Sequence, residues 1–516
     1  MKPAFYITTA IDYVNGKPHL GHAYERITSD VIARWKRLAG HEVRFLTGTD
    51  EHGIKVQKAA AEEGLDPQTY TDRLVPAFEE AWQALDISYD RFIRTTDADH
   101  KATVTALLEA VREAGWLEEK DYEGWYCEGC EAFKTDKDLV GEACPDHPNR
   151  ALTWLQETNL FFKLSAFQEP LLAHYEAHPE FVQPESRRNE VLFLIKEGLA
   201  DLSISRSVDS VSWGIPISFR PDSVIYVWFD ALINYLTGAG YGTDAALFER
   251  FWPADLHVLG KDVTRFHCII WPAMLMAAGV ALPRTIFAHG WVLTGDARKL
   301  SKSDKTTTEG ERDLSPLAIA TTYGPDAIRW FLTHEITFGR DGEFTWQRFE
   351  DVYNAHLANG LGNLLSRSVG MGHKYFGGVP APVGPPDPLL SALCAEATAK
   401  TTDAYEALRL HDATSAAWTI ITTCNEQVQA REPWKMAKDE GRRDELADFL
   451  YGLMEALRVA CVLLSPVMPR KTRQCLEALK AEDSLELGLE AATAWGGLRA
   501  ADLERPSPLF PRIDQL

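Results

Sequence analysis

Two histidines near the amino terminus have the type and spacing of an anion-binding site. His19 and His22 lie where an apolar strand predicted for Phe5–Thr9 gives way to a helix predicted for Ala23–Ala39. Residues three apart at a helix start share one face, and the unpaired amide groups there attract anions. Gly21 removes a side chain between them, so a flat ring can lie against the backbone. The segment therefore predicts a site for a purine triphosphate; simple capping of the helix by both histidines is the alternative.

Four residues between positions 127 and 147 form a metal-ligand pattern. Two residues separate Cys127 from Cys130, and two separate Cys144 from His147. Each pair can present two ligands from one tight turn, and thiolate with imidazole is a combination that zinc prefers. Four protein ligands leave no open position, so we expect a structural ion that stabilises its own loop. Free loop cysteines are one alternative, and a redox pair is another that leaves the second pair unexplained.

A basic loop is predicted far downstream. Lys299 and Lys302 lie three apart in Lys-Leu-Ser-Lys-Ser, with Ser301 between them, after a predicted strand and a glycine turn. Lysine acts as a point charge that can follow a moving phosphate. The alternative is a solvated surface loop.

Aromatic and acidic side chains follow several predicted strand ends. Tyr13 and Asp50 do so in the first part of the chain, and Trp228, Tyr235 and His267 do so later. In one parallel sheet they would face a common crevice, because ligands bind beyond the carboxyl ends of such strands. The lining suits a thioether, whose sulfur contacts aromatic rings favourably and can accept a hydrogen bond from a tyrosine hydroxyl or a histidine N–H. An ordinary aromatic core is the alternative.

The elements that must position these residues alternate between strand and helix. Strands are predicted at Phe5–Thr9, Val43–Thr47, Val224–Trp228, Leu256–Leu259 and Ile286–Val292. Helices are predicted at Ala23–Ala39, Ile54–Glu63, Thr69–Leu85 and His100–Ala114. This alternation predicts a parallel, doubly wound sheet, interrupted by an insertion. From about Phe349 the pattern is helical, with helices at Val352–Tyr375, Leu389–Glu406, Asp412–Val428, Asp444–Leu464 and Arg470–Leu479, which predicts a bundle.

Length and composition limit the class of protein. A chain of 516 residues predicts about three domains. The net charge of −22, from 53 basic and 75 acidic residues, argues against non-specific nucleic-acid binding but leaves a local binding surface open. No signal peptide is recognisable, and the longest apolar stretch, Cys268–Leu282, is too short to span a bilayer. We therefore expect a cytoplasmic protein without a membrane partner.

Taken together, the motifs resemble those of a known family. PHLGH and KLSKS are similar to the HIGH and KMSKS signatures of class I aminoacyl-tRNA synthetases. The segments FLTGTDEHG, YVWFDALINY, RFHCIIWPAML and REPWKMAK, with the Cys/His pattern, resemble methionyl-tRNA synthetases in particular. The resemblance covers nearly the whole chain in the same order.

The resemblance implies an α/β fold, a split Rossmann-type parallel sheet with a zinc-bearing insertion, followed by an all-α helical bundle. The implied divisions are the two halves of the catalytic domain at residues 1–116 and 223–298, the connective insertion at 117–222, the KMSKS-like loop and stem-contact segment at 299–350, and the anticodon-binding domain at 351–516. The implied activity joins L-methionine to ATP as methionyl-adenylate and then charges tRNA(Met). The resemblance also implies that Mg²⁺ binds with ATP and that Cys127, Cys130, Cys144 and His147 hold one structural Zn²⁺.

The resemblance also implies roles for individual residues. The residues expected to bind ATP are His19, Gly21, His22, Lys299, Ser301 and Lys302, of which the two histidines and two lysines are expected to be catalytic. Asp50 is expected to hold the methionine amino group, and the side-chain pocket to be formed by Ile11, Tyr13, Trp228, Ala231, Leu232, Tyr235 and His267. Asn363, Arg367 and Trp434 match positions that read the anticodon.

Three features depart from the family pattern. KLSKS has leucine in place of methionine, a volume-conserving change that is usually tolerated. The loop Asp304–Asp313 is unusually charged, and Asp12 stands where many members have an aromatic residue or proline. The chain also lacks the extra tRNA-binding domain of dimeric relatives, so we expect a monomer.

Other enzyme classes fit less well. Synthetases for branched aliphatic amino acids need a large editing insertion, because one methylene gives only about 10–200-fold discrimination, and the insertion here is too short. A cysteinyl enzyme would need a zinc ion with an open position, whereas the ligands here form a closed set. A nucleotidyltransferase that forms other adenylates would not require the bundle. A further alternative is an inactive tRNA-binding relative. The presence of His19, His22, Lys302 and Asp50 argues against it.

Overall fold

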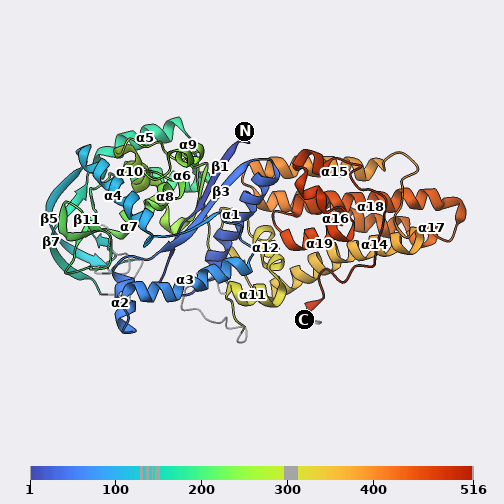
Figure 1. The fold of residues 1–516 in the computed structure, drawn as a ribbon, viewed down its shortest axis with the longest axis horizontal. Coiled ribbons are helices and arrows are strands. Elements are labelled where there is room, and N and C mark those ends of the chain that lie inside the picture. The colour runs from blue at the N-terminus through green and yellow to red at the C-terminus, as the bar shows by residue number, and fades with distance from the viewer. Residues whose placement is uncertain are drawn as a thin grey trace.

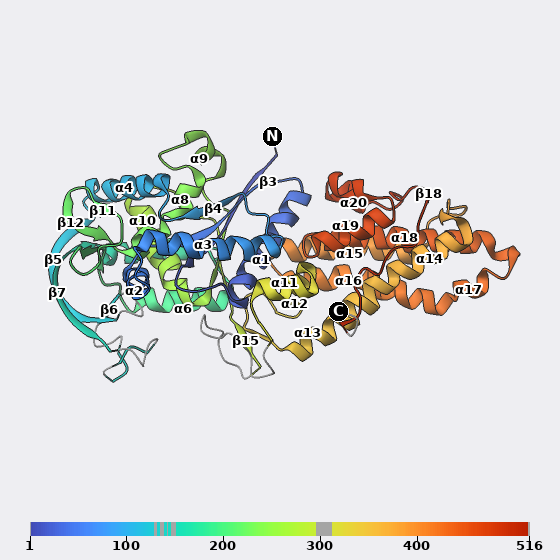
Figure 2. The same ribbon diagram turned by 60° about the horizontal axis from the view of Figure 1, so that its bottom comes forward.

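The computed structural model describes residues 2–127, 132–134, 139–141, 143–145, 151–295 and 312–513. Five residues with predicted roles, Cys130, His147, Lys299, Ser301 and Lys302, lie outside these ranges. The molecule is elongated, with a sheet-containing lobe at one end and a helical lobe at the other (Figure 1). Figure 2 shows the same division from a second direction. Among the described residues, no helix has the length and apolar character needed to cross a membrane.

A seven-stranded parallel sheet organises the first lobe, as the alternating pattern predicts. Its strands are β1 (Ala4–Thr9), β2 (Asp12–Tyr13), β3 (Glu42–Asp50), β4 (Arg91–Arg94), β8 (Val182–Gln183), β13 (Leu256–Gly260) and β14 (Ile286–His289). The order is β2-β3-β1-β13-β14-β8, with β4 also paired to β3. Parallel neighbours need long crossovers, and those of the first half are α1 (Leu20–Leu38), α2 (Ile54–Glu62), α3 (Pro67–Ala84) and α4 (Ala98–Glu113).

The two halves of this sheet meet where β1 pairs with β13. Ile7, Thr8 and Thr9 lie opposite Leu256, His257 and Val258 in parallel register. Helix α1 packs on β1, β3 and β13, and its apolar side chains are buried there. The sheet is buried on both faces, which explains why the sequences of its strands are continuous apolar runs.

One strand prediction is wrong. The run Val224–Trp228 does not join the main sheet. Its first part belongs to β12 (Arg220–Ile225), in an antiparallel sheet with β10 (Ser205–Ser207) and β11 (Pro216–Ile217). Trp228 instead lies on α7 (Val227–Leu232), followed by α8 (Asn234–Ala239) and α9 (Ala245–Phe251). Periodicity alone does not separate a short apolar strand from a buried helix.

A second predicted strand, Ile286–Val292, is interrupted at Gly290. Strand β14 ends at His289, and β15 (Val292–Thr294) pairs instead with β16 (Gly342–Phe344). A Cβ atom at Gly290 would lie 2.2 Å from the carbonyl of Arg340. The close approach of two backbones therefore requires glycine at this break.

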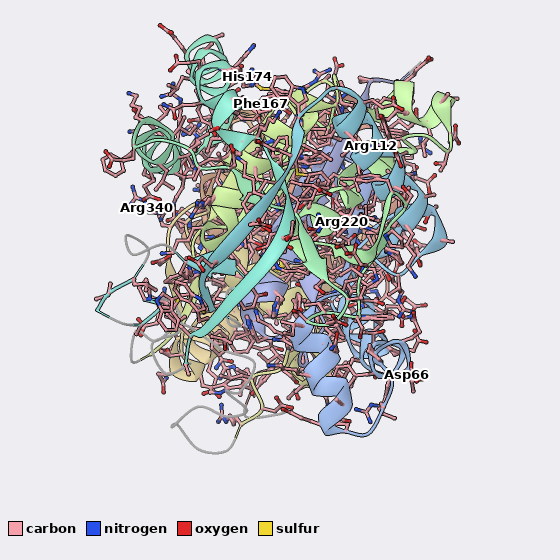
Figure 3. The ribbon with its side chains drawn as sticks, turned by 90° about the vertical axis from the view of Figure 1, so that its left-hand side faces the viewer. Asp66, Arg112, Phe167, His174, Arg220 and Arg340 are labelled. Carbon is pink, nitrogen blue, oxygen red and sulfur yellow. The ribbon has the colours of Figure 1, made fainter. Side chains whose placement is uncertain are left out.

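A further antiparallel sheet lies within the range 117–222. Strand β5 (Leu117–Cys127) pairs with β7 (Thr153–Phe162) from Leu117↔Phe162 to Tyr126↔Thr153, and β6 (Ala132–Lys134) and β9 (Leu202–Ser203) flank them. Figure 3 shows β5 and β7 crossing the face of the lobe, near Arg220, which donates to the Thr158 carbonyl at 2.6 Å. The same range also contains α5 (Gln168–Ala177), α6 (Glu185–Lys196) and β8, and through β8 it adds a strand to the main parallel sheet.

The helical lobe confirms the predicted all-α region. Helix α13 (Trp346–Val352) continues through a π-helical segment, Tyr353–Gly362, into α14 (Asn363–Phe376). The remaining helices are α15 (Pro388–Glu406), α16 (Leu410–Arg431), α17 (Pro433–Met436), α18 (Arg443–Leu464), α19 (Pro469–Ala478) and α20 (Leu489–Thr493). Strands β17 (Gly378–Val379) and β18 (Ala501–Asp502) tie the carboxyl-terminal segment to this lobe.

Helix α12 (Pro325–His334) joins the two lobes, and in Figure 1 it lies between α1 and the bundle. Helix α10 (Trp271–Ala277) lies between β13 and β14 in the chain, and α11 (Pro316–Tyr323) immediately precedes α12. The fully buried Arg329 of α12 pairs with Asp30 of α1 at 2.6 Å. It also donates to the carbonyls of Val467 at 2.8 Å, Pro466 at 2.8 Å and Leu85 at 3.2 Å. One buried cation thus connects three parts of the chain.

We predict that Arg329→Met lowers the free energy of unfolding by about 3 kcal/mol, because it leaves part of a buried polar cluster without its partner. Arg112→Met is the matched control: Arg112 pairs with Glu109 on the surface, and the loss should stay below about 1 kcal/mol. Urea denaturation of the three proteins measures both effects. Equal midpoints for Arg329→Met and the parent protein would contradict this role.

Candidate functional site

A cavity of about 300 Å³ opens at the carboxyl ends of β1, β3, β13 and β14. It gathers residues that are far apart in the chain. The sequence-predicted residues that line it are Ile11, Tyr13, His19, Gly21, His22, Asp50, Trp228, Ala231, Leu232, Tyr235 and His267. Every described residue predicted to bind nucleotide or amino acid therefore lies at one site.

The two histidines both cap helix α1 and line the cavity. Nδ1 of His19 accepts the Gly21 amide N–H at 3.0 Å, and Nδ1 of His22 accepts the His19 amide N–H at 3.1 Å. This reciprocal cap begins the helix at Leu20, earlier than predicted. Because each Nδ1 is an acceptor, each neutral ring carries its proton on Nε2. The cap therefore fixes the tautomer that can donate a hydrogen bond to an anion.

Gly21 has a steric role beside the histidine rings. A Cβ atom at this position would lie 2.9 Å from Cε1 and 3.1 Å from Nδ1 of His19. The rings of His19 and His22 are themselves close, with centroids 3.8 Å apart. Any larger residue would therefore displace the His19 ring from its cap.

A chain of charged groups supports this wall of the cavity. Asp12 pairs with Arg26 at 2.7 Å and lies 3.8 Å from Nε2 of His22. Arg26 also pairs with Glu25 at 2.6 Å, and Glu25 contacts His289 at 2.9 Å. Sequence reasoning missed Glu25 and His289 as cavity residues. His289 is the last residue of β14, as Asp50 is of β3. The expectation that ligands bind beyond the carboxyl ends of parallel strands could therefore have identified His289 from the sequence.

Asp50 and Tyr13 are placed together by strand register. Strands β2 and β3 pair Tyr13 with Asp50, and the Tyr13 hydroxyl donates to the His52 carbonyl at 3.0 Å. The Asp50 side chain is nearly buried. A carboxylate in this position can hold a cationic amino group at the cavity wall.

Asp230 links this acidic strand end to the aromatic pocket. It accepts from Nδ1 of His52 at 2.6 Å and from Nε2 of His100 at 2.7 Å, and all three side chains are buried. Burial raises the pKa of Asp230, but the neighbouring histidines outweigh this effect and bring the pKa down to about 2. Because Asp230 lies on α7, these bonds tie that helix to His52, two residues after Asp50, and to His100.

The aromatic pocket is built from stacked and hydrogen-bonded rings. Trp228 stacks on Phe266 with ring centroids 3.8 Å apart. The Tyr235 hydroxyl lies 2.7 Å from Nε2 of His267, whose Nδ1 faces the Val263 carbonyl at 3.0 Å. The carbonyl can only accept, so Nδ1 carries the His267 proton and Tyr235 donates to Nε2. Burial lowers the pKa of His267 to about 4, which keeps the ring neutral.

This arrangement corrects one expectation. We expected the hydroxyl of a tyrosine or the N–H of a histidine to donate to a thioether sulfur. In the structure the Tyr235 and His267 protons are already engaged, with each other and with Val263. The pocket around these two residues therefore offers its shape and contact with aromatic rings to a ligand.

The predicted anticodon residues meet in the helical lobe. Asn363 and Arg367 of α14 line a groove of about 720 Å³ between that helix and α16. The Arg367 guanidinium lies over the Trp434 ring, 5.7 Å from its centroid, and Trp434 is 36% exposed. An exposed aromatic face next to amide and guanidinium donors suits an unstacked base.

Half of the predicted zinc pattern can be placed. Cys127 ends β5, and both Cys127 and Cys144 are buried. Cys130 and His147 lie outside the described residues. The two thiols therefore stay consistent with a shared ion, while the complete ligand set stays a prediction.

Comparison with known proteins identifies the family. A family model described as class I tRNA synthetases (M) matches residues 5–153 and 149–369, and one for the anticodon-binding domain of tRNA ligases matches residues 387–493. The methionine–tRNA ligase of Caldanaerobacter subterraneus subsp. tengcongensis is 43% identical over 524 residues, spanning 100% of this chain and 80% of the relative. The chain belongs to the methionine–tRNA ligase family.

Further relatives of the methionine–tRNA ligase family agree in sequence and fold. The Synechocystis enzyme is 43% identical over 99% of this chain and 98% of its own length. The structure titled Mycobacterium tuberculosis methionyl-tRNA synthetase in complex with methionyl-adenylate has a TM-score of 0.92 at 41% identity, covering 99% of this chain and 100% of that chain. The apo form has a TM-score of 0.85 at 39% identity, covering 99% and 98%. The predicted class I fold is thereby confirmed.

We predict that Gly21→Ala slows adenylate formation at least tenfold, because the new methyl group displaces the His19 ring. Gly370→Ala is the control, since a Cβ atom at Gly370 meets no atom within 4 Å. Amino-acid-dependent pyrophosphate exchange measures the rates, and circular dichroism checks that both variants fold. Parent-level exchange by Gly21→Ala would refute the steric role.

Proposed function

We propose that this chain activates L-methionine with ATP, forming methionyl-adenylate and pyrophosphate, and transfers the methionyl group to the 3′ end of tRNA(Met). The observation that carries the proposal is the single cavity in which an anion-binding helix start, a buried carboxylate and an aromatic pocket meet. Membership of the methionine–tRNA ligase family agrees with it.

In the first step a carboxylate oxygen of methionine attacks the α-phosphorus of ATP. A new phosphorus–oxygen bond forms, the bond to the bridging oxygen breaks, and pyrophosphate leaves. His19 and His22 donate through Nε2–H to the oxygens on which charge develops, which stabilises the transition state. Lys299, Ser301 and Lys302 are proposed to hold the leaving pyrophosphate. Mg²⁺ bound with ATP supplies further neutralisation of phosphate charge.

Methionine is held at both ends. The Asp50 carboxylate binds its ammonium group, and the thioether enters the pocket formed by Ile11, Tyr13, Trp228, Ala231, Leu232, Tyr235 and His267. The Asp230–His52 bond ties helix α7 of the pocket to the segment that follows Asp50. Holding methionine at two points positions its carboxylate for the attack on ATP, and such positioning is a large source of rate acceleration.

In the second step a ribose hydroxyl at the tRNA 3′ end attacks the methionyl carbonyl carbon, and AMP leaves. Selection of the tRNA is assigned to the helical lobe, where Trp434 stacks on an anticodon base while Asn363 and Arg367 contact base edges.

A structural zinc ion completes the proposal. Cys127, Cys130, Cys144 and His147 would hold it, and the buried position of the two described thiols fits a site closed to water. The ion would stabilise the tip of the β5–β7 insertion and take no part in the chemistry. We further propose that the protein acts as a monomer in the cytoplasm.

Pyrophosphate exchange tests the amino-acid specificity. Labelled pyrophosphate should enter ATP in the presence of methionine, because adenylation is reversible, and not above background with leucine or cysteine. A scan of the twenty amino acids with the purified chain measures this. Equal exchange with leucine would reject the assignment of the pocket.

We predict that Trp434→Ala lowers kcat/KM for tRNA about tenfold to hundredfold, because stacking of one base on an aromatic side chain contributes about 1–3 kcal/mol. Trp434→Phe should retain most of the charging activity. Leu389→Ala, at another exposed apolar residue of this lobe, should leave charging unchanged. Methionine-dependent pyrophosphate exchange should be unaffected in all three variants, and its loss in Trp434→Ala would contradict a role confined to the anticodon.

A further inference from the structure

Three side chains that commonly bind metals meet where α12 enters the helical lobe. His334 is the last residue of α12, Glu335 follows it, and His356 lies in the π-helical segment Tyr353–Gly362. One potential ligand atom from each lies within 4.8 Å of the other two. All three side chains are half-buried. None of them belongs to the cavity described above or to the predicted zinc pattern.

The His334 ring presents a lone pair in a fixed orientation. Its Nδ1 lies 3.1 Å from the Thr414 hydroxyl, and that hydroxyl donates to the His411 carbonyl at 2.8 Å. Thr414 therefore accepts from Nδ1–H of His334, which leaves the lone pair on Nε2. Trp330 stacks on the ring at 4.4 Å and holds its plane. An outer hydrogen bond of this kind orients metal-binding histidines.

Glu335 retains one carboxylate oxygen for a cation. Arg348 donates to this residue through Nε and Nη2, both 2.7 Å from Oε2. Among the described residues none donates to Oε1. A guanidinium on one oxygen and a metal ion on the other is compatible with the two lone-pair directions of a carboxylate.

His356 can complete the set by exchanging one hydrogen bond for a bond to the metal. The Trp330 indole nitrogen lies 3.3 Å from its Nδ1, at the long end of the hydrogen-bond range. Binding a metal through Nε2 moves the ring proton to Nδ1, so the buried Trp330 N–H loses its acceptor, and the metal bond must outweigh that loss.

The cluster opens onto the groove of about 720 Å³ that His334 and His356 line together with Asn363 and Arg367. Two histidines and one glutamate with an open fourth position form a ligand set that zinc adopts in proteins. Water from the groove can fill the fourth position. We propose that His334, Glu335 and His356 form a second metal site that binds a divalent transition-metal ion, with Zn²⁺ as the best match.

The position of this site gives it a structural consequence. His334 and Glu335 end the helix that carries Arg329, whereas His356 lies seven residues before Asn363 on the helix leading into α14. A bound ion would therefore fasten the end of α12 to the start of the anticodon-binding lobe. Since binding to the folded state alone stabilises it, Zn²⁺ should raise the melting temperature through this site.

Metal counting on the full chain tests the proposal. The chain is dialysed with Zn²⁺, and zinc per chain is measured by mass spectrometry for the parent, His356→Asn and Glu335→Gln. The parent should hold one more ion than His356→Asn, and Glu335→Gln, which keeps the side-chain volume, should bind this ion at least tenfold more weakly. His41→Asn is the control, because this half-buried histidine contacts only the Phe5 ring in the sheet lobe among the described rings.

Cobalt absorption separates the two metal sites. Co²⁺ bound by histidine and carboxylate gives visible bands without the thiolate charge-transfer absorption expected of a cysteine site. These bands should be present in the parent and in His41→Asn and absent from His356→Asn. Equal zinc content and equal cobalt spectra in the parent, His356→Asn and Glu335→Gln, all folded by circular dichroism, would overturn the proposal.

Discussion

The parallel pairing of β1 with β13 is the interaction on which the rest of the structure depends. It aligns Ile7–Thr9 with Leu256–Val258 and so joins two chain segments that are separated by the whole insertion. Because the strands are parallel, their carboxyl ends lie at one edge of the sheet. The helix start after β1, the acidic end of β3 and the residues after β13 and β14 consequently line one cavity. Without this pairing the start of helix α1 and Asp50 would not face the pocket residues Trp228, Tyr235 and His267.

At the edge of that sheet, the hydrogen bonds that cap helix α1 also orient His19 and His22 for anion binding. His19 and His22 cap α1 through Nδ1, which satisfies amide groups that a helix start leaves unpaired. The same bonds place the ring protons on Nε2, where they can be donated to a phosphate. Capping and anion binding, which are alternatives when only the sequence is considered, are therefore two consequences of one geometry.

The link between the lobes combines apolar packing with buried charge. One continuous apolar core runs from α1 through α12 into the bundle, and the Arg329–Asp30 pair lies within that junction. A close-packed core of this kind resists bending. The groove beside Asn363 and the cavity beside His19 are therefore held in a defined relative position by the body of the protein.

The sequence by itself determined the parallel sheet, the helical lobe and most of the cavity residues. The motif spacings and the alternation of strand and helix depend on local periodicity, which the chain displays directly. Only the tertiary structure decided the placement of Val224–Trp228 outside the main sheet, the break at Gly290 and the contribution of β8, because each depends on a partner distant in sequence. The same reason explains why the roles of Glu25 and Asp230 escaped prediction. Their roles come from buried charge pairs between elements, and a single sequence does not show which charges are brought together when the chain folds.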